Sequence, residues 1–131
     1  MAAAETYPDD LKYHEEHDWA RLEGEEAVLG ITWFAGDALG ELVHFEPPEV
    51  GSTVTKDQSY GEVESVKAVS DLIAPLSGEV LEVNQQVVEA PETVNEDPYG
   101  NGWLIRVRLS DSAEAEALLD ADAYRQLLAQ Q

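Results

Sequence analysis

The sequence contains no cysteine at all. The chain therefore has no disulfide framework, no thiol nucleophile, and no thiolate ligands for zinc or an iron–sulfur cluster. Any redox chemistry carried out on this protein must come from a group that is added to it.

Cationic side chains are scarce as well. The 28 Asp and Glu residues outnumber the 7 Lys and Arg residues and leave a formal net charge of -21. This surplus repels phosphate backbones and anionic lipids, which excludes nucleic acid and anionic membranes as partners. Long apolar runs are missing too, and none approaches the roughly 20 residues that a membrane span needs. The expected partners present basic surfaces.

The chain start, "MAAAETYPDD", lacks the basic and apolar regions of a secretion signal and the Arg-rich pattern of a transit peptide. We therefore expect a cytoplasmic protein. Its 131 residues fit one domain over 1–131, with a core at about 13–110 and a helical tail at 111–131. A monomer is expected.

Short apolar runs separated by Gly, Pro and acidic turns predict a mostly β fold. Thr32 as N-cap and Gly40 at the end predict one short helix inserted between strands. The repeat Gly-Glu-Val at 61–63 and 78–80 suggests a β-sandwich with two similar halves. The tail is predicted to form helices with a break near Asp120. The predicted strands are 19–22, 27–31, 42–45, 59–66, 69–73, 80–83 and 103–109.

The stretch "ESVKAVSD" at 64–71 has a nearly symmetric pattern that predicts a hairpin centred on the bond between Lys67 and Ala68. A two-residue hairpin loop normally needs residues that adopt φ > 0, as in Asn-Gly or Gly-X. The pair Lys-Ala matches neither of these sequences. A wider type I turn is therefore expected. The predicted strand pairs are Val66 with Val69, Ser65 with Ser70, and Glu64 with Asp71.

Lys67 at this tip allows two interpretations. It is either a surface lysine that keeps the hairpin soluble, or an amine presented for covalent attachment of an acyl cofactor. In the second case the flanking polar residues form a recognition surface for the modifying enzyme. These residues are Glu64, Ser65, Ser70 and Asp71.

Other residues give no sign of catalysis. His14 and His17 are three apart near a predicted strand, whereas the helical zinc pair needs a spacing of four, so no metal site is expected. No Gly-rich phosphate loop follows a strand, and no serine lies in a nucleophile elbow. Trp33 and Phe34 would form a contact patch if they were exposed. We therefore expect no catalytic residue.

Three segments, "VESVKAVSD", "PLSGEVLEVN" and "NEDPYGNGWLIRV", occur in this order. With them, the chain resembles the H-protein family of the glycine cleavage system from about Tyr13 to the C-terminal helix. Lipoyl modules of 2-oxoacid dehydrogenases lack the helical tail, and biotinyl modules usually place methionine beside the lysine. The resemblance implies a lipoyl-domain-like β-sandwich of the barrel-sandwich hybrid kind.

The resemblance also implies a function. Lys67 would carry lipoate in amide linkage and shuttle the aminomethyl group of glycine without catalysis by the chain itself. The implied partners are a pyridoxal-phosphate (PLP) dependent glycine decarboxylase, a tetrahydrofolate-dependent aminomethyltransferase, dihydrolipoyl dehydrogenase and lipoate-attaching enzymes. Asp18 replaces the glutamate of the family's His-Glu-Trp motif, so the resemblance places it in a cleft for the arm, with Asp71 facing it.

The chain departs from the family pattern at "GITWFAG", where Trp33, Phe34 and Gly36 replace polar residues. This change puts the arm cleft and the choice of partner in doubt. Two alternatives stay open: an H-like lipoyl relay that serves other lipoate-dependent enzymes, and an unmodified β-rich interaction module.

Overall fold

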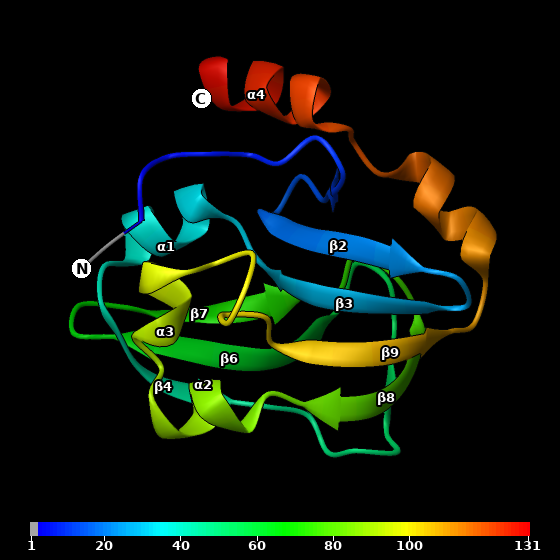
Figure 1. Ribbon diagram of the computed structural model, residues 1–131, viewed down its shortest axis with the longest axis horizontal. Helices are drawn as coiled ribbons and strands as arrows, with labels where there is room; N and C mark the ends of the chain where they lie inside the picture. The colour runs from blue at the N-terminus through cyan, green and yellow to red at the C-terminus, as the bar shows by residue number, and fades with distance from the viewer. Residues whose placement is uncertain (1–2) are drawn as a thin grey trace.

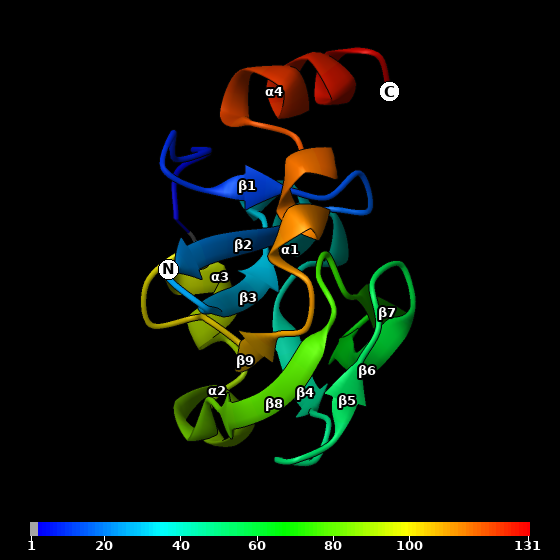
Figure 2. The same ribbon diagram turned by 90° about the vertical axis from the view of Figure 1, so that its right-hand side faces the viewer.

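A computed structural model describes residues 3–131 of the chain. Two antiparallel sheets form the body of the protein, and short helices lie at its edges (Figures 1 and 2). The six-stranded sheet has the order β1-β2-β3-β9-β8-β5, and the three-stranded sheet has the order β4-β6-β7. None of the helices in residues 3–131 is long and apolar enough to cross a membrane.

The strands are β1 (Lys12–Tyr13), β2 (Asp18–Glu23), β3 (Glu26–Ile31), β4 (Leu42–Glu46), β5 (Thr53–Val54), β6 (Ser59–Ser65), β7 (Val69–Ile73), β8 (Gly78–Val83) and β9 (Ile105–Leu109). The helices are α1 (Trp33–Leu39), α2 (Gln85–Glu89), α3 (Thr93–Glu96) and α4 (Ala121–Ala129), with a 3₁₀ helix η1 (Ser112–Ala117). The predicted β-sandwich is confirmed, and each predicted strand appears with ends shifted by a residue or two.

The main core lies between the two sheets. Alternate residues point inward, as in the cross-strand pair Phe45 and Val63, which are both 1% exposed. From the other sheet Ile105 and Val107 join the same buried cluster. Removing one of these side chains from water stabilises the fold by about 1.5–3 kcal/mol.

The Gly-Glu-Val repeat falls on equivalent strands of the two sheets, β6 and β8. In each case the glycine lies against a backbone carbonyl of a neighbouring strand, Glu46 O for Gly61 and Arg108 O for Gly78. A β-carbon at Gly61 would come within 2.5 Å of the Glu46 oxygen. The repeat therefore marks close strand contacts in both halves of the sandwich.

The predicted helix is α1. Thr32 caps it by accepting a hydrogen bond from Ala35 N at 3.3 Å, and Gly40 ends it with φ of 87°, a value that L side chains rarely adopt. Helices α2 and α3 were not predicted, because segments of four or five residues carry too little periodicity to be distinguished from turns. Asn84 caps α2.

The tail breaks where the sequence predicts. Asp120 separates η1 from α4 and caps α4 through Ala123 N at 2.8 Å. A second core forms under α4, where the rings of Tyr13 and Tyr124 stack at 4.7 Å and pack with Tyr7 and Trp19. The tail and the N-terminal segment thus cover one end of the six-stranded sheet (Figure 1).

Candidate functional site

The loop between β6 and β7 protrudes from the body at the left edge of Figure 1. Its closing hydrogen bond runs from Ser65 N to Ala68 O at 2.8 Å, and Glu64 pairs with Val69. The loop is therefore centred on the bond between Val66 and Lys67. The symmetric pairing predicted around Lys67 and Ala68 is wrong by one residue.

The Ser65 side chain explains this register. Its Oγ accepts hydrogen bonds from Lys67 N at 3.2 Å and Ala68 N at 3.1 Å, which closes the turn one residue early. The predicted wider loop is thus also wrong, since two residues suffice. The loop still avoids the primed conformation, because only His17 and Asp57 among the described non-glycine residues have φ > 0.

Lys67 stands at this tip, exposed to solvent. Its Cε lies 3.5 Å from the position that a β-carbon on Gly40 would take, so the lysine stem passes over a glycine. Lys56, Arg106, Arg108 and Arg125 all form ion pairs with carboxylates. The ammonium groups of Lys12 and Lys67 pair with no residue in 3–131, and of these two lysines only Lys67 is exposed. An exposed, unpaired amine on an ordered turn fits a covalently attached acyl group.

The four flanking residues divide into two kinds. Glu64 and Asp71 are exposed on the outer face of the three-stranded sheet. Ser65 is 4% exposed and its hydroxyl is used within the turn, so it shapes the tip and presents no surface. Ser70 is half-buried and its hydroxyl donates to Asp71 O at 3.3 Å. Two of the four predicted recognition residues thus lie on the surface.

Asp18 is only 2% exposed. The Tyr60 hydroxyl donates to its Oδ2 at 3.2 Å, and burial raises the pKa of the Asp18 carboxyl well above its usual range. Tyr60 is the second residue of β6, roughly 20 Å along the strand from the tip. The structure therefore brings Asp18 to Tyr60, and not to Lys67 or to the exposed Asp71.

Sequence reasoning missed Asn95, which lies beside the tip. Its amide nitrogen donates to Gly40 O at 2.9 Å, and its oxygen accepts from Leu42 N at 3.0 Å. Leu42 is the cross-strand partner of Ser65, so Asn95 holds both the strand next to the turn and the glycine under Lys67. A hollow of about 200 Å³ adjoins Gly40 and Asn95. The sequence gives no sign of this role, because both bonds join segments more than 50 residues apart.

Trp33 and Phe34 are half-buried and do not form the exposed patch considered above. The indole nitrogen of Trp33 donates to Ala3 O at 2.7 Å, and the Phe34 ring lies 4.7 Å from the ring of His17. Both residues pack with the second core under α4. Trp33 and Phe34, which depart from the family pattern, thus make contacts within the chain.

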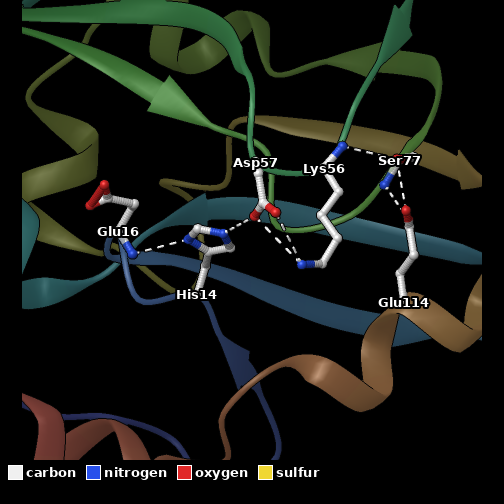
Figure 3. Close-up of polar contacts among 6 residues, drawn as sticks. All are labelled: His14, Glu16, Lys56, Asp57, Ser77 and Glu114. Atoms are coloured by element: carbon white, nitrogen blue, oxygen red, sulfur yellow. Dashed lines mark hydrogen bonds and ion pairs between the residues drawn. The ribbon is translucent and has the colours of Figure 1, made fainter.

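The two histidines point to different partners. His14 Nδ1 accepts from Glu16 N at 3.0 Å, so the ring donates through Nε2 to Asp57 Oδ1 at 2.6 Å (Figure 3). His17 Nδ1 lies 2.7 Å from the Tyr124 hydroxyl. No group of three His, Asp or Glu residues within 3–131 is placed to hold a metal ion.

The contacts in Figure 3 tie several turns together at the start of β6, opposite to the tip. Lys56 Nζ lies 3.4 Å from Asp57, and Lys56 N donates to Ser77 Oγ at 2.9 Å. Ser77 N in turn donates to Glu114 of η1 at 2.8 Å. These bonds attach the tail to the sheets at the end of the molecule that lies away from Lys67.

Comparison with known proteins gives the family. The model of the glycine cleavage H-protein family matches residues 11–131. The chain belongs to this family. It is 52% identical over 124 residues to the glycine cleavage system H protein of Anaeromyxobacter sp. (strain K), covering 95% of this chain and 97% of that protein. The H protein of Symbiobacterium thermophilum is 53% identical over 117 residues, covering 89% and 91%.

A solved structure agrees. The crystal structure of a glycine cleavage system H protein from Mycobacterium marinum superposes with a TM-score of 0.87 at 43% identity, covering 94% of this chain and 99% of that one. Members of this family are lipoyl carriers of the glycine cleavage system. This membership argues against the unmodified interaction module.

Proposed function

We propose that Lys67 carries lipoate in amide linkage and presents it in turn to the enzymes of glycine cleavage. These are the PLP-dependent glycine decarboxylase, the tetrahydrofolate-dependent aminomethyltransferase and dihydrolipoyl dehydrogenase, with a lipoate-attaching enzyme acting first. The observation that carries the proposal is the Lys67 ammonium, which is exposed on an ordered turn and unpaired within residues 3–131.

The proposed division of labour follows from the chemistry. Lipoate, when attached, supplies the disulfide and thiols that a chain without cysteine lacks. The protein supplies a rigid base for the arm, and tethering raises the effective concentration of the carried group at each active site. Such a carrier needs no catalytic residue of its own. We also propose that it works as a monomer in the cytoplasm.

Asp18 and Asp71 are proposed to line the resting place of the loaded arm, as the position of His17-Asp18-Trp19 suggests. The Asp18 carboxyl is buried and accepts from the Tyr60 hydroxyl, so contact with an arm requires this hydrogen bond to open.

The relay alternative rested on Trp33 and Phe34. These side chains contact Ala3 and His17, so they serve the chain's own fold. Their change therefore gives no reason to expect a different set of partners, which favours glycine cleavage.

The test is the intact mass of protein from lipoate-fed cells. We expect the wild type to gain one lipoyl group and Lys67→Arg to gain none, because a guanidinium offers no acylatable amine. Both proteins should have the same free energy of unfolding within about 0.5 kcal/mol, since the side chain is exposed. A Lys67→Arg protein that gains the lipoyl mass would refute the site.

A further inference from the structure

Exposed apolar side chains gather around Lys67. Six large hydrophobic residues of the described chain are notably exposed, and three of them lie in the tip or on the strands beside it: Val43, Val66 and Val69, at 48%, 77% and 61%. The other three, Leu22, Val50 and Val88, lie on β2, in the turn after β4 and on α2. Single exposed valines need no explanation, but a group around a modification site does. We call these three the valine rim.

The sheet geometry places the rim on one face. Glu64 has Val69 as its partner on β7 and His44 as its partner on β4. Val43 falls at the register shift between Leu42 and His44, where an irregularity turns a strand residue outward. Because neighbouring strands are about 4.8 Å apart, Val43 and Val69 lie roughly 10 Å from each other with Glu64 between them. Val66 is next to Lys67 in the loop.

Carboxylates continue this face away from the tip. Glu62 pairs with Asp71 and Glu46, and all three are exposed on the same side as Glu64. The surface thus has an apolar part at the lysine and an acidic part behind it. A partner protein whose surface complements this one has an apolar opening with cationic side chains at one side of the opening.

We propose that the valine rim docks against the active-site entrance of the enzyme that attaches lipoate to Lys67. This inference rests on the proposed function. The Lys67 ammonium first loses a proton to solvent. The neutral amine then attacks a lipoyl adenylate, which forms the bond between Nζ and the acyl carbon, breaks the C–O bond between the acyl carbon and the phosphate oxygen, releases AMP and passes a second proton to solvent. A site that holds a hydrocarbon chain and a dithiolane must be apolar, and the adenylate phosphate requires cations nearby.

The rim and the carboxylates then have different tasks. The carboxylates attract the cationic enzyme over a distance and act on the association rate. The valines contribute only after contact, when their apolar surface leaves water, and their effect is not screened by salt. The rim therefore determines how long the tip stays at the entrance.

The experiment compares Val43→Thr/Val66→Thr/Val69→Thr with Val50→Thr as the matched control. Threonine keeps the branched shape and strand preference and replaces one apolar methyl group with a hydroxyl. The probe is a purified lipoate–protein ligase with lipoate, ATP and Mg²⁺, and the measurement is the initial rate against concentration of the unmodified protein. We expect KM of the triple variant to rise about tenfold with kcat unchanged, at low and high salt alike.

The control should keep the wild-type KM, although Val50 is 63% exposed. An unchanged KM in the triple variant overturns the docking proposal. So does a change in the sedimentation coefficient of the triple variant, which would make the rim a contact between copies of the chain. If the wild type itself gains no lipoyl mass, the proposed function fails instead, so the two failures are distinguishable.

Discussion

Asp18 is a buried carboxyl group whose side-chain partner is the Tyr60 hydroxyl, and no cation within residues 3–131 pairs with it. Because its folded-state pKa is raised, the folded protein keeps the proton at a pH where the unfolded chain has lost it. This contribution to stability is complete below the unfolded pKa of about 3.8 and is lost as the pH rises toward the folded value. The contribution of Asp18 to stability should therefore fall as the pH rises above 4.

The prediction at this residue concerns Asp18→Asn. The amide cannot ionise and keeps an acceptor for Tyr60, so the variant should lose less stability than the wild type between pH 5 and pH 8. Urea unfolding at both values measures this. Asp71→Asn, which removes a charge at an exposed position, is the control and should keep the wild-type slope. Equal slopes in all three proteins would contradict the assignment.

The turn between β6 and β7 depends on one hydroxyl. Ser65→Ala removes the acceptor for Lys67 N and Ala68 N and should cost about 1 kcal/mol of unfolding free energy. Amide hydrogen exchange at Ala68 should become faster. Ser70→Ala is the matched control, because that hydroxyl contacts only the Asp71 carbonyl. Equal exchange in both variants would show that the strands hold the turn without Ser65.

At the scale of elements, local signals predicted α1 and the break at Asp120 well, since caps act within three residues. Local signals did not predict the hairpin register correctly. Moving the hairpin centre by one residue shifts the cross-strand register by two, so the predicted and the observed centre both keep the same alternation along the strands. The Ser65 hydroxyl determines which of the two hairpin centres forms, and strand propensities do not predict this choice.

The charge of the whole molecule predicts how it meets its partners. At -21, and one unit lower after acylation, attraction to basic surfaces should weaken as the Debye length falls from about 30 Å at 0.01 M salt to about 8 Å at 0.15 M. The association rate of the lipoylated protein with the aminomethyltransferase, followed by stopped flow, should fall over this range more than the dissociation rate rises.

Glu64→Gln should flatten this salt dependence, because the residue is exposed beside the tip. Glu15→Gln is the control: it removes the same charge beside His14, at the end of the molecule opposite to the tip. A salt-independent association rate would mean that docking is apolar, with the valine rim as the main contact. Equal slopes for the two variants would mean that only net charge matters.

The sequence by itself determined the β-rich sandwich, the short capped helix, the tail and the lysine at a hairpin tip, because each follows from residues close together in the chain. Tertiary structure alone decided what these parts contact. It buried Asp18 against Tyr60, 42 positions away, and joined His17 to Tyr124, 107 positions away. It also turned Trp33 from a possible surface patch into a support for the N-terminal segment. Burial and partner choice depend on which distant segments pack together, and propensity and spacing act only along the chain.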